Sequence, residues 1–274
     1  MNIVDDDKFI DIDKVIRTKN PKLYRLMPSF LIRYLKKIAH QDELNQAINN
    51  QKDKNGLEFV NGVLSDMGIT YESFGTENIP TNGRYIFASN HPLGGLDGLV
   101  VINETGKYFP NVKFVVNDLL LNVKNMDSIF VPVNKHGKQS VEYARRIDEA
   151  YKSNDQILYF PAGLCSRKIN GKITDLHWQK NFISKAIKYQ RDIIPIYFSG
   201  KNSSFFYNLA YLRKMLGIRA NIEMFFLVDE MYKQQNKALK LTYGKPIPYT
   251  LFDDSKSLSD WTLFVRNVVY SLKL

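Results

Sequence analysis

The chain has 274 residues, with 38 Lys and Arg against 28 Asp and Glu, and a formal net charge of +10. Hydrophobic residues make up 44%, which excludes a disordered chain, and the single cysteine excludes a disulfide scaffold and suits a reducing cytosol. The positive charge predicts an anionic partner, and by itself leaves open nucleic acid, a membrane surface and an acidic carrier.

The start of the chain, with Asp5, Asp6 and Asp7, is acidic where a secretory signal would be basic. No uncharged run approaches the ~18–20 apolar residues that a membrane-spanning helix needs. The sequence therefore predicts a protein that is soluble or peripheral to a membrane.

Residues 8–67 have a helical pattern that closes at Met67-Gly68, where glycine is the expected stop. Within it, Lys14 to Gln41 holds eight basic residues and no acidic one. From Pro28 on, apolar and basic residues fall on different faces of a helix: Phe30, Leu31, Tyr34, Leu35 and Ile38 on one, Arg33, Lys36 and Lys37 on another. Such a helix can lie on an anionic bilayer or pack on the core with a solvated basic face, and both interpretations stay open.

From residue 69 on, short apolar runs alternate with helical stretches. This alternation predicts an α/β domain with a largely parallel sheet flanked by helices. The predicted strands are 69–74, 85–89, 113–116, 129–133, 156–160, 192–199, 222–228 and 239–243, and the predicted helices 97–107, 140–152, 178–190, 208–216 and 259–272. We therefore expect an N-terminal helical appendage in residues 1–68 and an α/β domain in residues 69–274.

A glycine-rich turn follows the predicted strand 85–89. It contains Asn90 and His91 and leads through Gly94-Gly95 to Asp97, at a strand end where α/β proteins place ligands. A carboxylate on one ring nitrogen of His91 would leave the other nitrogen free to take a proton. A His and an Asp near a turn are also a common structural arrangement, so these two residues alone do not decide the role.

The other histidines and the single cysteine are weaker candidates for a catalytic or metal-binding role. His40, His136 and His177 are expected at the surface, Cys165 is expected to fill a loop, and no cluster has metal-ligand spacing. With a base but no nucleophile, direct attack by a substrate hydroxyl or amine is the natural hypothesis. A second basic region, 163–219, indicates an anionic ligand, whereas nucleic acid is disfavoured because no DNA- or RNA-binding signature occurs.

Four sequence blocks then occur in order: Asn90-His91 with Asp97, residues 129–133 (IFVPV), residues 160–167 (FPAGLCSR) and residues 194–196 (IPI). Across roughly residues 70–250 they resemble the glycerol-phosphate and lysophospholipid acyltransferase superfamily. Residues 197–203 (YFSGKNS) look most like its bacterial haemolysin-like branch, which is associated with O-acylation of amino-acid lipids such as glycine or ornithine lipids.

The resemblance implies that His91 is the general base for an acceptor hydroxyl and that Asp97 orients it. The acyl donor would be a thioester of acyl carrier protein or coenzyme A, with no tightly bound cofactor and no metal. The substrate-binding residues that the resemblance implies are Asn90, Lys135, Phe160, Pro161, Gly163, Ser166, Arg167 and Pro195. The residue types of the third block agree with a role in binding the acceptor or an anionic group, since a glycine permits close backbone approach and an arginine beside a hydroxyl can clamp an anion.

The chain departs from the family pattern at three places. Five residues separate His91 and Asp97 where four are usual, so the turn must differ in shape. Ala162 stands where a Glu is usual, and Val133 where an Arg is usual. The two missing charges favour an acceptor without the phosphate of lysophosphatidic acid.

Two aromatic groups remain. Trp178, Phe182 and Tyr189 are expected in the core rather than in an acyl-chain tunnel, and Phe205-Phe206-Tyr207 is expected as a membrane-facing or acyl-contacting loop cluster.

The sequence thus predicts an O-acyltransferase acting on a lyso amino-acid lipid, cytoplasmic and peripheral on the inner face of the cell membrane, with no nucleic-acid partner. A lysophosphatidic acid or glycerol-phosphate acyltransferase and a non-catalytic, haemolysin-like lipid-binding protein are the alternatives.

Overall fold

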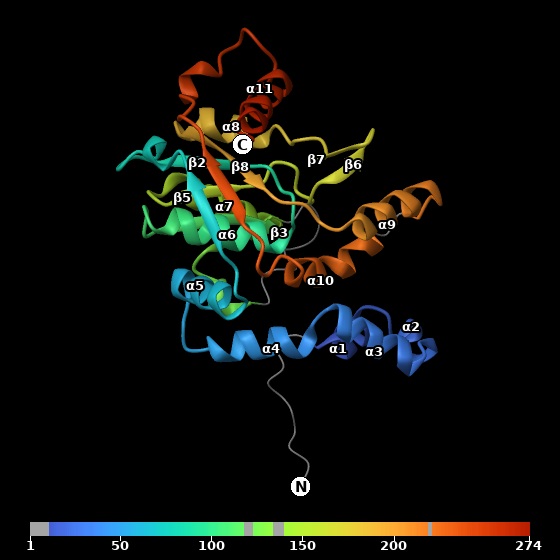
Figure 1. The fold of residues 1–274 in the computed structure, drawn as a ribbon. Coiled ribbons are helices and arrows are strands. Elements are labelled where there is room, and N and C mark those ends of the chain that lie inside the picture. The colour runs from blue at the N-terminus through green and yellow to red at the C-terminus, as the bar shows by residue number, and fades with distance from the viewer. Residues whose placement is uncertain (1–10, 118–122, 134–139, 219–220) are drawn as a thin grey trace.

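A computed structural model describes residues 11–117, 123–133, 140–218 and 221–274 (Figure 1). Its centre is a seven-stranded sheet in the order β1-β9-β8-β2-β5-β3-β4, in which β8 and β9 run antiparallel and the other neighbours run parallel. The predicted α/β class with a largely parallel sheet is confirmed. The strands are β1 (Tyr71–Phe74), β2 (Tyr85–Ser89), β3 (Val112–Asn117), β4 (Phe130–Val133), β5 (Gln156–Tyr159), β8 (Asp192–Ser199) and β9 (Leu239–Tyr243).

Helices cover both faces of the sheet, because alternate residues of a central strand belong to opposite cores. In β2, Phe87 packs in the cluster that includes residues of α5 and α6, whereas Ile86 and Ala88 pack with residues of α7, α8 and α11. All five side chains of β2 are buried, which explains its continuous apolar sequence. The helices are α5 (Gly56–Asp66), α6 (Gly95–Gly106), α7 (Ser140–Lys152), α8 (Asn181–Tyr189) and α11 (Leu258–Ser271).

Within residues 11–55, four shorter helices precede α5, and Figure 1 shows α1, α2 and α3 lying away from the sheet. They are α1 (Ile12–Lys19), α2 (Pro21–Leu26), α3 (Ser29–Ile38) and α4 (Gln41–Asn50). Only part of the apolar face of α3 is covered, since Ile38 is buried while Phe30 and Tyr34 are 66% and 48% exposed. No helix within the described ranges combines the length and the apolarity needed to cross a bilayer.

His40 joins α3 to α4 in a left-handed backbone conformation, with a φ of 44°. Its ring stacks on Tyr232 at 4.3 Å, and its Nε2 lies 3.1 Å from Asp229 Oδ1. Both partners belong to α10 (Leu227–Tyr232). The prediction of a surface His40 is wrong, because the histidine ties the N-terminal helices to the α/β region.

The predicted strand 222–228 is also wrong. A 3-10 turn, η4 (Ile222–Phe226), leads there into α10. A strand would turn Glu223 and Phe225 to the same face, but Glu223 is fully buried and Phe225 is 62% exposed. The buried Glu223 carboxylate pairs with two arginines, and this pairing outweighs the apolar run that suggested a strand.

The structure contains a hairpin that the sequence analysis missed, β6 (Arg167–Ile169) paired antiparallel with β7 (Lys172–Thr174). Its turn residues, Asn170 and Gly171, both have positive φ, as the favoured two-residue hairpin turn requires.

Phe205-Phe206-Tyr207 lies in a helix rather than in a loop. The helix α9 (Ser204–Met215) begins four residues earlier than predicted, because the Ser203 side chain accepts a hydrogen bond from the Phe206 amide. Phe206 and Tyr207 are buried, and only Phe205 is exposed, at 50%. The core position predicted for Trp178, Phe182 and Tyr189 is confirmed, since all three are buried.

Candidate active site

The first and third sequence blocks meet at the carboxyl edge of the sheet. β2 ends at Ser89 and α6 begins at Gly95, so residues 90–94 form the turn between them. β2 pairs in parallel with β5 and with β8, and the segments that follow these strands therefore leave the sheet at the same edge. Phe160 is the first residue after β5.

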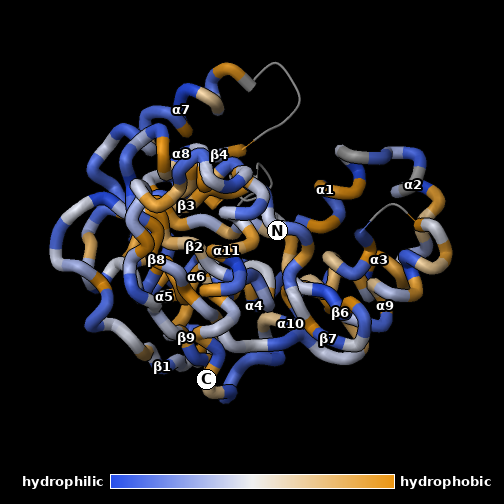
Figure 2. The backbone as a smooth tube through the Cα atoms, turned by 90° about the horizontal axis from the view of Figure 1, so that it is seen from above, coloured by the Kyte–Doolittle hydropathy of each residue, from blue (hydrophilic) through white to orange (hydrophobic). Residues whose placement is uncertain are grey.

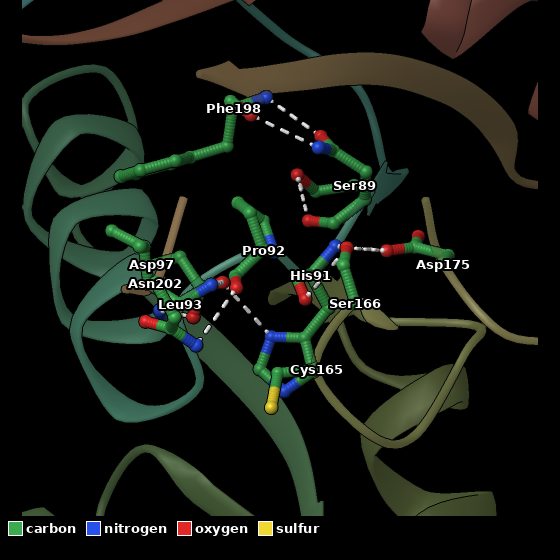
Figure 3. A network of polar contacts seen from close by, with 12 residues as sticks. Ser89, His91, Pro92, Leu93, Asp97, Cys165, Ser166, Asp175, Phe198 and Asn202 are labelled. Carbon is green, nitrogen blue, oxygen red and sulfur yellow. Dashed lines mark hydrogen bonds and ion pairs between the residues drawn. The ribbon is translucent and has the colours of Figure 1, made fainter. Parts of the chain in front are cut away.

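His91 and Asp97 are in contact (Figure 3), with 3.0 Å between His91 Nδ1 and Asp97 Oδ2. The amides of Leu93 and Gly98 donate to the same carboxylate at 2.9 and 3.0 Å. Gly94, with a φ of 93°, supplies a backbone conformation that few other residues adopt. The five residues between His91 and Asp97 thus form a single turn that brings the two side chains into contact. Nε2 of His91 is then the ring nitrogen that can take up a proton.

The pair lies in a mostly apolar setting. The side chain of Asp97 is fully buried and that of His91 is 14% exposed. Phe160 stacks on the imidazole at 4.3 Å and is held in turn by an edge contact with Phe114 at 5.2 Å. Burial lowers the pKa of His91, but the carboxylates of Asp97 and Asp175 together outweigh burial, so the pKa lies above its usual value.

A second carboxylate, Asp175, holds the backbone of His91. The His91 amide donates to Asp175 Oδ1 at 3.2 Å, and Ser166 Oγ donates to the same oxygen at 2.6 Å. The other oxygen accepts from Trp178 Nε1 at 2.8 Å. The Ser166 amide donates to the His91 carbonyl at 2.7 Å, so the peptide groups on both sides of His91 are fixed. Ser166 is itself buried, and in this structure it contacts the turn that carries His91.

Asn90 anchors the turn to the neighbouring strand. Its side-chain amide donates to the Phe198 carbonyl at 2.9 Å, and its Oδ1 accepts from the Phe198 amide at 2.7 Å. Asn90 is buried, and both ends of its amide are engaged with β8.

Arg167 is paired within the protein. Its Nη2 and Nε donate to Glu223 Oε1 at 2.8 and 3.2 Å, and the second carboxylate oxygen lies 2.7 Å from Arg213 Nε. The guanidinium also lies over the ring of Phe206, 5.0 Å from its centroid. The group predicted to clamp a substrate anion therefore already holds a carboxylate of the chain.

The remaining predicted site residues are spread out. Pro161 is buried in the turn after β5. Gly163 has a φ of 67°, and a methyl group there would meet no atom within 4 Å, so its glycine is needed for backbone conformation. Pro195 lies within β8 against Gly244, where an added methyl would come within 2.8 Å of the proline ring. Lys135 lies outside the described residues.

Cys165 is buried, and Arg167 Nη1 approaches its sulfur at 3.0 Å. Burial raises the pKa of this thiol to about 11, which keeps it protonated at neutral pH. The predicted role as a loop filler fits this setting. Within the part of the chain that the structure describes, no group of His, Cys, Asp and Glu is arranged to hold a metal ion.

Sequence reasoning missed Asp175 and Glu223. Asp175 is one of two acidic residues in the basic region 163–219, and an isolated acid in such a region was an available signal. Glu223 interrupts the apolar residues 222–227 in the same way.

Comparison with known proteins adds independent information. A family model described as acyltransferase matches residues 14–274. A protein of Bacteroides thetaiotaomicron named lyso-glycine lipid O-acyltransferase is 47% identical over 272 residues, which cover 98% of this chain and all of the relative. A protein of Phocaeicola vulgatus with the same name is 45% identical, with 98% of each chain covered.

Among solved structures, the 1-acyl-sn-glycerophosphate acyltransferase PlsC of Thermotoga maritima is similar at 16% identity with a TM-score of 0.49. The alignment covers 95% of this chain and 93% of that one.

Proposed function

The chain belongs to the acyltransferase family and is an O-acyltransferase, and from this premise we propose that it acylates the hydroxyl of a lyso-glycine lipid with His91 as general base. The observation that carries the proposal is the 3.0 Å contact between His91 Nδ1 and the buried Asp97 carboxylate. That contact fixes one tautomer of the ring and stabilises the imidazolium that forms when Nε2 takes a proton.

The reaction proceeds without a covalent enzyme intermediate. Nε2 of His91 removes the proton of the acceptor hydroxyl as its oxygen attacks the thioester carbonyl, and a new C–O bond forms. The tetrahedral intermediate then collapses, the C–S bond breaks, and the imidazolium returns its proton to the leaving thiolate. The donor is a thioester of acyl carrier protein or coenzyme A. The buried Cys165 thiol takes no part, because burial holds its pKa at about 11.

The pairing of Arg167 supports an acceptor without a phosphate. A phosphate monoester is usually bound by a free guanidinium in bidentate geometry. Here Glu223 Oε1 receives two hydrogen bonds from Arg167, at 2.8 and 3.2 Å. Together with the names of the two relatives, this favours lyso-glycine lipid over lysophosphatidic acid.

The proposal assigns residues 1–68 to a membrane-facing segment and residues 69–274 to the catalytic domain. Asn90, Phe160, Ser166 and Arg167 contribute by shaping and holding the turn of His91, and the third block that contains Gly163 lines the acceptor side. The enzyme works at the cytoplasmic face of the cell membrane, where both lipid acceptor and thioester donor are available.

Incubation of the purified chain with acyl carrier protein and coenzyme A thioesters and a panel of lyso-lipids tests the proposal. We expect the wild type to transfer the acyl group to lyso-glycine lipid. We expect His91→Ala to lose this activity while its circular dichroism spectrum matches that of the wild type. Full activity of His91→Ala would overturn the role of the base. Preferred transfer to lysophosphatidic acid would overturn the acceptor.

A further inference from the structure

Large apolar side chains form an exposed stripe along α9 and its C-cap residue, Leu216. Phe205, Leu212 and Leu216 recur at intervals of seven and four residues and are 50%, 45% and 61% exposed. Tyr211 and Met215 flank them at 66% and 65% exposure. Single exposed apolar residues are ordinary on soluble proteins, whereas a stripe along one helix face marks an interaction surface.

The α3 helix presents a matching face. Phe30, Arg33, Tyr34 and Lys37 recur at the i, i+3, i+4 and i+7 positions, and all four are exposed. The exposed aromatic residues Phe30 and Tyr34 of the apolar face therefore adjoin the basic Arg33 and Lys37, while Ile38 at the end of the same apolar face is buried.

The fold places the two helices near each other, although they are far apart in the sequence. Both α3 and α9 contact η4, where Phe225 is 62% exposed. Two perpendicular views place α3 and α9 on the same side of the molecule (Figures 1 and 2). Phe30, Phe225 and the α9 stripe thus belong to neighbouring elements, which we call the α3–η4–α9 surface.

Basic side chains prevail in this region, and the carboxylates nearest to it are paired: Asp13 with Lys36 of α3, and Glu223 of η4 with Arg167 and Arg213. Lys14 to Gln41, which contains α3, and Lys201 to Asn221, which contains α9, hold no Asp or Glu. The β6–β7 hairpin contacts α9 and adds the exposed Lys168 and Lys172. A surface that combines exposed apolar side chains with an excess of basic groups complements an anionic bilayer, where basic groups meet head groups and aromatic rings sit at the interface.

We propose that the α3–η4–α9 surface docks the enzyme on an anionic lipid bilayer. The inference deepens the proposed function, on which it rests for the lipid acceptor. The basic side chains would also suit an acidic carrier protein, but such a partner would not account for the long apolar stripe of α9. The buried side of α9 carries Phe206, which lies under Arg167 of the third block. Docking through α9 therefore sets the bilayer next to the segment that fixes His91.

Flotation with phosphatidylcholine vesicles, with and without phosphatidylglycerol, tests the surface without any donor or acceptor. The test variant is Leu212→Gln/Met215→Gln/Leu216→Gln, whose three side chains are all exposed. The matched control is Leu251→Gln/Leu263→Gln, with 42% and 53% exposed side chains on η5 (Tyr249–Leu251) and α11. We expect the triple variant to bind anionic vesicles roughly tenfold more weakly or worse, and the control to bind like the wild type.

Activity measurements distinguish a failure of the proposed bilayer surface from a failure of the proposed function. With the acceptor in vesicles, the triple variant should lose activity, whereas with acceptor dissolved as monomers it should match the wild type. Unchanged vesicle binding by the triple variant overturns the surface. The proposal is also overturned if the triple variant binds vesicles normally but has lower activity with acyl carrier protein thioesters. It is overturned as well if the wild type is a dimer and the triple variant is a monomer. Vesicle binding that depends on the stripe, with no acyl transfer to any lyso-lipid, supports the surface and overturns only the proposed function.

Discussion

Replacing Asp97 with Asn removes one charge from the site at nearly constant volume. In the wild type, Asp97 Oδ2 accepts from His91 Nδ1 and Leu93 N, and Oδ1 accepts from Gly98 N. An amide has one oxygen, so its NH2 group must face a donor in either orientation. If the oxygen stays toward His91, the NH2 opposes the Gly98 amide. If it turns away, the NH2 opposes Leu93 and drives His91 into the tautomer with the proton on Nε2.

The first orientation leaves a buried donor unsatisfied, which costs about 1–3 kcal/mol of stability. The second removes the base, because Nε2 then carries a proton before the substrate arrives. In both, the developing imidazolium loses its counter-charge. We expect kcat/KM to fall by roughly 10²–10⁴-fold, which corresponds to about 3–5 kcal/mol of transition-state stabilisation.

The pH dependence of kcat/KM provides a second, independent test. Burial lowers the pKa of His91, and the carboxylates of Asp97 and Asp175 together raise it above its usual value, with Asp97 contributing more than Asp175. Without the Asp97 carboxylate the pKa falls, so the neutral ring persists to lower pH. The acidic limb of kcat/KM should therefore move to lower pH in Asp97→Asn, while the plateau drops.

The assay is kcat/KM for acyl transfer to lyso-glycine lipid across pH, with His91→Ala and the double variant as references. Because the two residues act as one unit, the double variant should be no slower than His91→Ala. Near wild-type activity of Asp97→Asn, or an acidic limb that stays in place, would refute the reasoning.

Further predictions concern residues around the pair. Asp175→Asn should lower kcat and shift the acidic limb to lower pH, because this carboxylate also raises the pKa of His91; an unchanged limb in a folded variant would contradict the contact. Glu223→Gln should lower the free energy of unfolding by about 3–5 kcal/mol, since two mostly buried guanidinium groups lose their counter-charge; chemical denaturation measures this, and a loss near zero would refute the pairing. Cys165→Ala should stay active, and the wild-type thiol should resist a thiol reagent at pH 8 until the chain is unfolded.

The sheet could be predicted from the sequence because its central strands are short apolar runs. The predicted strands 85–89, 192–199 and 239–243 agree with β2, β8 and β9 residue for residue. Asn170-Gly171 is a strong hairpin signal in the sequence, and both residues have the positive φ of the β6–β7 turn.

The misassigned segment, 222–228, shows where local pattern fails. Its apolar run suggests a strand, but a buried carboxylate needs a counter-charge, which Arg213 supplies from 10 positions away and Arg167 from 56 positions away. Long-range ion pairs of this kind leave no periodic trace in sequence.

The candidate site was only partly visible for the same reason. His91 and Asp97 are six positions apart, so their contact could be proposed from one turn. Asp175 reaches His91 from 84 positions away, and Asn90 reaches Phe198 from 108 positions away. These contacts exist only because β5 and β8 pair on either side of β2.

The Arg167–Glu223 pair has a consequence for energetic coupling. Ser166 donates to the His91 carbonyl, and Arg167, the next residue, is bound to Glu223 of η4. The turn that carries His91 and the proposed bilayer surface are thus joined through two adjacent residues. Linkage is reciprocal: any factor by which a bilayer tightens donor or acceptor binding through this pair is the factor by which those ligands tighten the enzyme's hold on the bilayer. Occupied enzyme would then stay at the membrane longer than empty enzyme.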